Sequence, residues 1–180
     1  MASHDLGDLL GPQYLDGIST LPMDALRARR GDCQEVEVAL SYLRRLVQGR
    51  LDIVLSALGR RADGEAPPDL DALVSQLPQI LSDRVRSPGN GRLPAFFAPD
   101  EVEVDQALLA RLEGIAGAAQ LSALAEVDDA ALDTMADELS RLEREVSVTR
   151  RALFEVIDAI QEEIVRRYKT GEATVDSLLS

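Results

Sequence analysis

Two stretches of the chain carry the same polar residue types at the same spacing. Each residue of the first stretch has its counterpart 106 positions later. The repeated residues are Glu37, Ser41, Arg44 and Asp52 in the first copy and Glu143, Ser147, Arg150 and Asp158 in the second. Gln48 completes the first copy, whereas Phe154 occupies that position in the second. Any two amphipathic helices share apolar spacing, so the match among polar types is the informative part of the repeat.

On a helix, each copy forms one straight polar stripe. At about 100° per residue, positions 37, 41, 44, 48 and 52 fall within an arc of roughly 80°. An apolar arc lies beside each stripe. Its residues are Val36, Leu40, Leu43, Val47, Leu51, Val54 and Leu58 in the first copy and Leu142, Val146, Leu153, Ile157, Ile160 and Ile164 in the second. If the helices pair through these apolar arcs, the two stripes flank a shared groove.

The stripe suits recognition of a guanine nucleotide. Arginine grips the O6 and N7 acceptors of guanine with two parallel donors, and it also pairs with phosphate and stacks on bases. A carboxylate suits the N1 and N2 hydrogens, and serine and glutamine add neutral hydrogen bonds. The stripe offers no activated base and no metal cluster, and the only histidine is His4. We therefore expect no enzyme, no catalytic residue and no metal site.

The same residues have a simpler interpretation. Acidic and basic residues beside an apolar seam usually form interhelical salt bridges in coiled coils. The chain would then be a ligand-independent coiled-coil adaptor protein. Ser41, Gln48 and Ser147 add nothing to a ladder of ion pairs, which favours the nucleotide interpretation. Both interpretations stay open at the level of residue types.

Composition narrows the class of protein. The 180 residues carry a net charge of -13, contain one cysteine and are 46% hydrophobic. The acidic charge argues against direct DNA binding, because phosphate binding requires a basic surface. The single cysteine excludes an intrachain disulfide and suits a reducing compartment. No apolar run approaches the length of a membrane span, so we expect a cytoplasmic protein without a membrane partner.

The elements that must position the stripes are two long helices, at about 32–62 and 128–170. The expected ends are Asp32 as the first N-cap, Asp128 or Asp129 as the second N-cap and Gly171 as the final stop. Connector helices are expected at about 69–86 and 100–117. No segment alternates long enough to predict a strand.

The predicted fold class is therefore all-α, with two long helices, a short helical connector and an N-terminal tail. Residues 32–180 would form the helical domain. Residues 1–31 would form a tail or a partner-binding segment, because their apolar residues are too numerous for a linker and too interrupted for one helix.

The stripe pattern resembles the motif of the RsiG family, which are actinobacterial anti-sigma factors that bind cyclic di-GMP and hold the sporulation sigma factor WhiG. The first copy, from Glu37 to Asp52, is complete. The second, from Glu143 to Asp158, departs from the family pattern at Phe154.

The resemblance implies that the motif helices pair as an antiparallel coiled coil. It also implies that an intercalated dimer of cyclic di-GMP, a regulatory ligand and not a cofactor, binds the stripes. The complex would sequester WhiG, a relative of flagellar sigma factors, and repress transcription that depends on it. The implied ligand-binding residues are the nine stripe residues, with the role of Phe154 left open.

Overall fold

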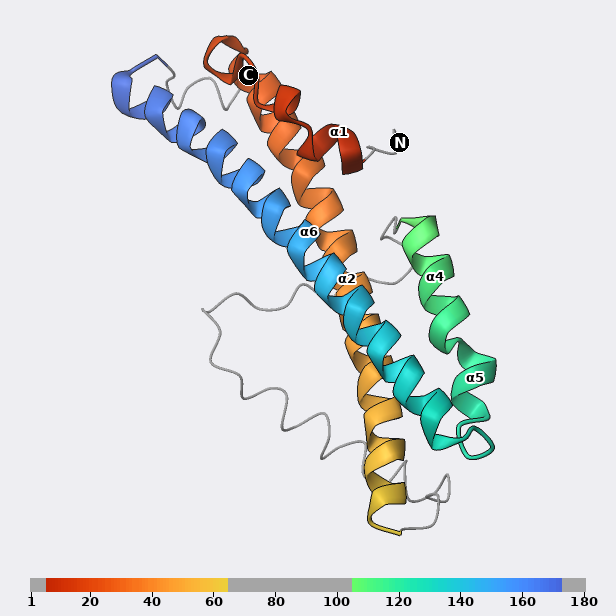
Figure 1. Cartoon of the computed structure of the whole chain (residues 1–180). Coiled ribbons are helices and arrows are strands. Elements are labelled where there is room, and N and C mark those ends of the chain that lie inside the picture. The colour runs from red at the N-terminus through yellow and green to blue at the C-terminus, as the bar shows by residue number, and fades with distance from the viewer. Residues whose placement is uncertain (1–5, 65–104, 173–180) are drawn as a thin grey trace.

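The computed structural model describes residues 6–64 and 105–172. Its elements are α1 (Leu6–Leu10), the 3-10 turns η1 (Pro12–Tyr14) and η2 (Ile18–Thr20), α2 (Met23–Ala62), α4 (Gln106–Ala116), α5 (Ala118–Ser122) and α6 (Asp129–Thr170) (Figure 1). The described residues contain no strand, and the predicted all-α class is confirmed. The connector helix expected at 69–86 lies outside the described residues. The helix expected at 100–117 begins at Gln106 in the described part, where the Asp105 carboxylate caps it.

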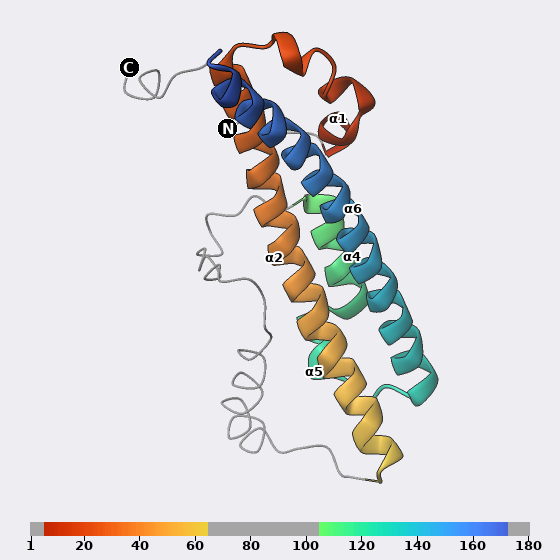
Figure 2. The same cartoon turned by 90° about the vertical axis from the view of Figure 1, so that its left-hand side faces the viewer.

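Helices α2 and α6 lie side by side and run antiparallel (Figures 1 and 2). Along the pair, residue numbers rise on α2 as those of their partners fall on α6. The hydrogen-bonded pairs are Arg27 with Tyr168, Arg30 with Gln161, Arg44 with Glu143 and Arg61 with Asp129. The predicted antiparallel pairing of the two motif helices is therefore confirmed.

An apolar seam with a period of seven residues holds this pair together. Its fully or almost fully buried residues are Leu26, Cys33, Leu40, Val47 and Val54 on α2 and Leu132, Leu139, Val146, Leu153 and Ile160 on α6. A seven-residue apolar repeat is typical of a left-handed coiled coil, because it keeps one face of each helix toward its partner. The seam fixes the rotation of both helices, and with it the direction of the stripes.

Helix α2 begins at Met23, so the expected start at Asp32 is wrong. Pro22 precedes the first turn, and the helix continues through Gly31. A glycine inside a helix costs about 1 kcal/mol relative to alanine. The burial of Leu26 and Cys33 on either side of Gly31 offsets that cost, because both side chains lie in the seam. Asp32 is an interior helical residue and caps nothing.

The ends of α6 are as expected. The Asp128 carboxylate accepts a hydrogen bond from the backbone N–H of Ala131 at 2.8 Å, and Gly171 ends the helix at a φ of 76°. The left-handed conformation favours glycine because it has no Cβ. The second stripe is thus carried on a helix with capping interactions at both ends.

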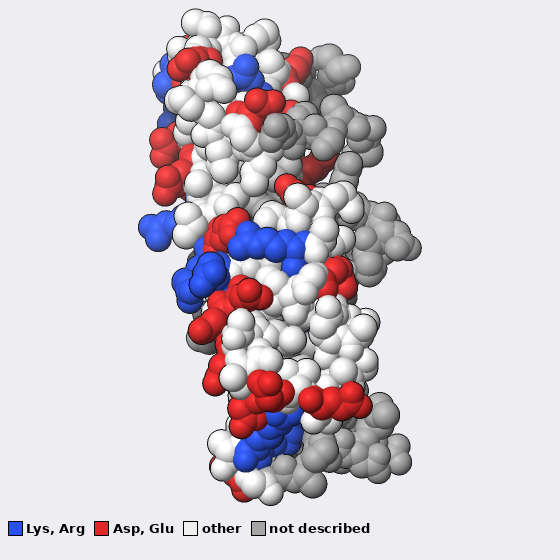
Figure 3. Space-filling model, turned by 45° about the vertical axis from the view of Figure 1, so that its right-hand side comes forward, with Lys and Arg blue, Asp and Glu red and all other residues white. Residues whose placement is uncertain are grey.

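One face of the coiled coil is covered by α4 and α5, which lie behind α2 and α6 in Figure 2. Arg50 of α2 donates hydrogen bonds to the carbonyls of Leu112 and Ala116 and forms an ion pair with Glu113. Arg111 of α4 forms an ion pair with Glu145 of α6 at 2.7 Å. Figure 3, which turns this side forward, shows small groups of acidic and basic side chains between broad uncharged areas. Within residues 6–64 and 105–172, no helix combines the length and apolarity that crossing a membrane requires.

The N-terminal segment, residues 6–22, packs against the end of the coiled coil where α2 begins and α6 ends. Leu9 is buried with the core residues, and the Tyr14 hydroxyl donates to the carbonyl of Arg29 at 3.2 Å. Burial raises the pKa of the Cys33 thiol and outweighs the opposite effect of Tyr14, so this cysteine stays protonated near neutral pH. The segment thus covers apolar surface of its own chain.

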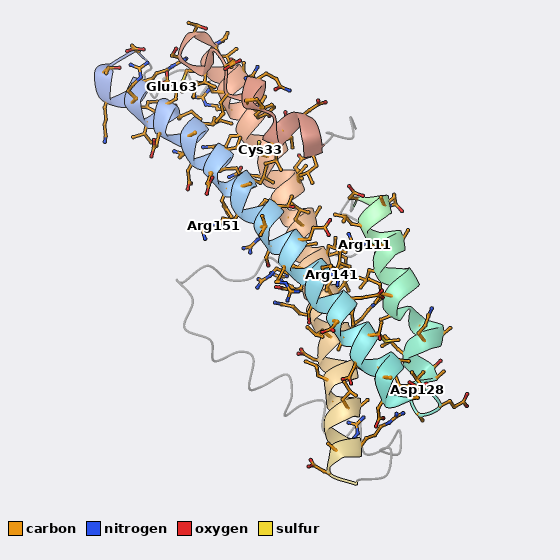
Figure 4. All side chains as sticks on the ribbon, in the orientation of Figure 1. Cys33, Arg111, Asp128, Arg141, Arg151 and Glu163 are labelled. Atoms are coloured by element: carbon orange, nitrogen blue, oxygen red, sulfur yellow. The ribbon has the colours of Figure 1, made fainter. Side chains whose placement is uncertain are left out.

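A buried arginine fastens this segment to α6. Arg167 occupies the seam position one heptad after Ile160, and its guanidinium donates to the carbonyls of Ile18 and Leu21. The same guanidinium pairs with Glu163 at 2.7 Å. Figure 4 shows Glu163 at this end of α6, beside the N-terminal segment. A buried charge requires such a full set of partners.

The Glu163 carboxylate is expected to make folding stability pH-dependent in acid. Hydrogen bonds from Arg166 and Arg167 lower its pKa from 4.5 to about 2. Between these values the unfolded chain binds more protons than the folded chain, so this contribution is complete above about pH 4.5 and is lost as the pH falls toward 2. Urea unfolding across this range should show a shallower pH dependence in Glu163→Gln than in the wild type. Glu162→Gln removes the neighbouring exposed carboxylate and serves as the control; equal slopes in wild type and Glu163→Gln would contradict the assignment.

Candidate ligand-binding site

The two stripes meet on one side of the coiled coil in two reciprocal clusters. In the first cluster, Arg44 Nε of α2 donates to Glu143 Oε1 of α6 at 2.8 Å. Ser147 Oγ and Gln48 Nε2 donate to the same carboxylate oxygen at 3.0 and 3.1 Å. A single glutamate of one helix therefore collects donors from both helices.

The second cluster repeats the first with the helices exchanged. Arg150 Nε of α6 donates to Glu37 Oε1 of α2 at 2.8 Å, and Ser41 Oγ donates to the same oxygen at 2.6 Å. The antiparallel arrangement converts the sequence repeat into an approximate twofold symmetry of the site. The core of the repeated motif, Glu, Ser and Arg, is brought together in both copies.

The serines and the glutamine take part in these ion-pair clusters. The expectation that Ser41, Gln48 and Ser147 contribute nothing to an ion-pair ladder is therefore wrong. Each donates a hydrogen bond to a glutamate, and that glutamate is also contacted by an arginine from the helix opposite to its own. Partly buried carboxylates accept several hydrogen bonds, and a single arginine nitrogen does not satisfy them. The presence of these two serines and this glutamine therefore fits both the nucleotide interpretation and the salt-bridge interpretation.

The glutamates use only one nitrogen of each arginine. Among the residues that the structure describes, neither Arg44 nor Arg150 uses its two terminal nitrogens, Nη1 and Nη2, in a hydrogen bond. The side chains are 35% and 29% exposed, respectively. The terminal edge of a guanidinium is the edge that grips a planar pair of acceptors. The glutamates thus hold both arginines in place and leave that edge open.

The electrostatics of the first cluster favour the ionised glutamate. Burial acts to raise the pKa of Glu143, but hydrogen bonds from Arg44 and Ser147 outweigh it, and the pKa lies below its ordinary value. The carboxylate stays charged at neutral pH and keeps Arg44 oriented.

An open groove of about 620 Å³ borders the first cluster. Its lining residues are Gln48, Leu51, Asp52, Ser140, Glu143 and Arg144. Small-molecule sites commonly span about 300–1,000 Å³. Asp52 is exposed at its edge, and its counterpart Asp158 is also exposed. The groove brings the carboxylate of Asp52 to the same side as Glu143.

Residues 12–81 and 118–180 match the family described as RsiG-like. The chain belongs to the RsiG-like family. No curated protein matches the chain. Membership of the RsiG-like family indicates an anti-sigma factor, which is a regulatory protein, and it implies a sigma factor as the partner.

The departure from the RsiG-like motif at Phe154 has a structural consequence. Phe154 is half-buried, packs against the core and lies under Arg150, with 5.1 Å between the guanidinium carbon and the ring centroid. This is a cation–π contact, in which the Arg150 guanidinium packs against the face of the Phe154 ring. Gln48 instead donates to the glutamate of its cluster. The two clusters therefore differ at this one motif position.

Two residues of the groove were not predicted from the sequence of this RsiG-like protein. Ser140 and Arg144 lie outside the repeated motif, and their counterparts 106 positions earlier are Gln34 and Val38. A repeat search cannot find residues that do not repeat. A helical wheel would place Ser140 near the stripe, one turn before Glu143. Across residues 6–64 and 105–172, no three His, Cys, Asp or Glu side chains lie close enough to share a metal ion.

Proposed function

We propose that this chain is a cytoplasmic anti-sigma factor that binds cyclic di-GMP on its two stripes and, in that state, sequesters WhiG, a flagellar-type sporulation sigma factor. Transcription that depends on this sigma factor is then repressed while the second messenger is abundant. The observation that carries the proposal is the pair of reciprocal clusters, which hold Arg44 and Arg150 on one face with their terminal edges open.

The open edges match the chemistry of guanine. Nη1 and Nη2 of an arginine donate in parallel to O6 and N7 of one guanine, or to two oxygens of a phosphate. Carboxylates that accept from guanine N1 and N2 are supplied by Asp52, which lines the groove with Glu143, and by its exposed counterpart Asp158. No residue acts on the ligand chemically; the site binds it.

The approximate twofold symmetry of the site supports a ligand that is itself symmetric. Cyclic di-GMP consists of two identical guanosine phosphate units joined in a ring, and a mutually intercalated dimer of it keeps twofold symmetry. Two equivalent arginines, one from each helix, then meet two equivalent bases. A mononucleotide would use one cluster and leave the other without a role.

The charge of the chain supports the choice of partner. Its net charge is -13, and the faces of a sigma factor that bind promoter DNA are basic. Opposite charges steer association and disfavour wrong partners. A ligand with exposed phosphates placed between the two proteins adds a second point of attachment for basic side chains of the sigma factor.

The alternative function is that of a ligand-independent coiled-coil adaptor. The observation in its favour is that Glu37 and Glu143 are already supplied with donors by the protein itself. In that case the clusters serve only to set the register of α2 against α6. The two functions differ in whether any nucleotide binds.

Titration calorimetry of cyclic di-GMP into the full chain, alone and mixed with WhiG, tests the proposal. We expect binding that appears or strengthens with the sigma factor present. Cyclic di-AMP is the matched control, because adenine presents an amino group where guanine presents O6. The absence of binding heat both for the chain alone and for its mixture with WhiG would overturn the proposal, and so would equal binding of the two dinucleotides. Binding of the sigma factor without nucleotide would then support the adaptor.

A further inference from the structure

The two ends of the stripe face are chemically different, although the motif is repeated. At the polar end, α2 contributes Gln48 and α6 contributes Arg144 to the groove beside Glu143. At the other end, the counterparts of these two residues are Phe154 and Val38. The groove lining of the polar end is therefore not repeated at the aromatic end.

Arg144 is the residue of the groove whose role is unexplained by the fold. It is exposed on α6, and the residues that the structure describes provide it with neither an ion pair nor a hydrogen bond. Its neighbour Glu143 is already paired with Arg44. The guanidinium of Arg144 is thus available at the wall of a groove large enough for part of a nucleotide.

We propose that Arg144 is an additional contact for the anionic part of the dinucleotide, so that the polar end of the site binds a phosphate that the aromatic end does not. This inference rests on the proposed function and adds to it an asymmetry of binding. Arg44 supplies the motif contact at this end, and Ser140 provides a hydroxyl on the same wall of the groove.

The asymmetry has a physical reason. A phosphate oxygen carries full negative charge, and a hydrogen bond to a charged group contributes more than a neutral one. At the aromatic end, Phe154 offers an apolar ring that already lies under Arg150. That end therefore favours the flat surface of a base, while the polar end favours charge.

The test is calorimetry of cyclic di-GMP with the full chain and WhiG, comparing the wild type with Arg144→Ala and with Arg141→Ala. Arg141 lies on the same helix, is exposed and does not line the groove (Figure 4). We expect Arg144→Ala to weaken binding about tenfold, in line with a charged hydrogen bond, and to reduce its dependence on salt. Arg141→Ala should bind as the wild type does.

The outcomes separate the two proposals. If the wild type binds and Arg144→Ala binds with the same affinity and the same salt dependence, the role of Arg144 is overturned and the proposed function stays in place. Equal weakening in both variants would assign the effect to general charge and overturn the inference too. If the wild type itself does not bind, the proposed function fails and the role of Arg144 fails with it.

Discussion

Replacing Arg44 or Arg150 with alanine is expected to lower cyclic di-GMP-dependent binding of the sigma factor about 100-fold, and the double substitution to abolish it. A bidentate arginine contact with guanine contributes roughly 1–3 kcal/mol, and each roughly 1.4 kcal/mol corresponds to a factor of ten. Each arginine is paired with one glutamate of the opposite helix, so each single variant should lose one contact with the ligand. Calorimetry and co-purification with WhiG, with and without nucleotide, measure the effect.

Each variant has a matched control in the neighbouring residue. Arg45 and Arg151 are exposed, and Arg151 is 85% exposed with its nearest carboxylate, that of Glu155, 3.9 Å away. Arg45→Ala and Arg151→Ala should therefore leave nucleotide binding unchanged. Circular dichroism should show the same helicity in all variants.

Arg44→Lys separates the two candidate functions. Lysine keeps a positive charge near Glu143 but lacks the planar fork of nitrogens. A nucleotide site should lose most of its affinity in Arg44→Lys, because the grip on guanine is lost. An adaptor held by ion pairs should bind its partner nearly as well as the wild type does. Undiminished ligand-dependent binding in both Arg44→Ala and Arg150→Ala would remove these arginines from the site.

Much of this arrangement could be predicted from the sequence because two periodicities coincide. The seven-residue apolar period predicts which faces meet, and the 106-residue offset predicts which polar residues share that face. Antiparallel pairing then brings Glu37 to Arg150 and Glu143 to Arg44. The caps of α6 at Asp128 and Gly171 could be predicted as well, because capping depends on local residue types.

The features that could not be predicted depend on tertiary contacts. Gly31 and Asp32 resemble a helix boundary, but the burial of Leu26 and Cys33 carries α2 through them. Arg167 resembles a solvated charge at a helix end, and it is buried only because residues 18–21 present their carbonyls to it. In both cases a local preference is overridden by packing that lies far away in the sequence.

The clusters also show why residue types alone left two functions open. Ser41 and Ser147 each lie four residues after a glutamate, and this spacing lets each hydroxyl reach the carboxylate on its own helix. The same hydroxyls suit a nucleotide. The pairing geometry adds that the Nε atoms of Arg44 and Arg150 are paired with glutamates of the opposite helix, and a binding experiment is what distinguishes the two functions.

The site depends on the apolar core that holds α2 and α6 together, and Leu43→Ala is expected to lower the free energy of unfolding by about 2–5 kcal/mol. Leu43 is completely buried in the apolar core and immediately precedes Arg44 in the sequence, so its replacement leaves a cavity in the core one residue away from the first cluster. Chemical denaturation followed by circular dichroism measures the loss. Leu55→Ala, the same change on the same helix at a side chain that is 49% exposed, should cost far less.

The comparison of these two leucine variants also tests the link between packing and ligand binding. If the seam fixes the direction of the stripes, Leu43→Ala should weaken cyclic di-GMP binding even at temperatures where the chain remains folded, because the two helices no longer hold Arg44 against Glu143. Leu55→Ala should leave binding unchanged. A loss of stability of less than about 1 kcal/mol in Leu43→Ala would contradict the assignment of this residue to the core of the coiled coil.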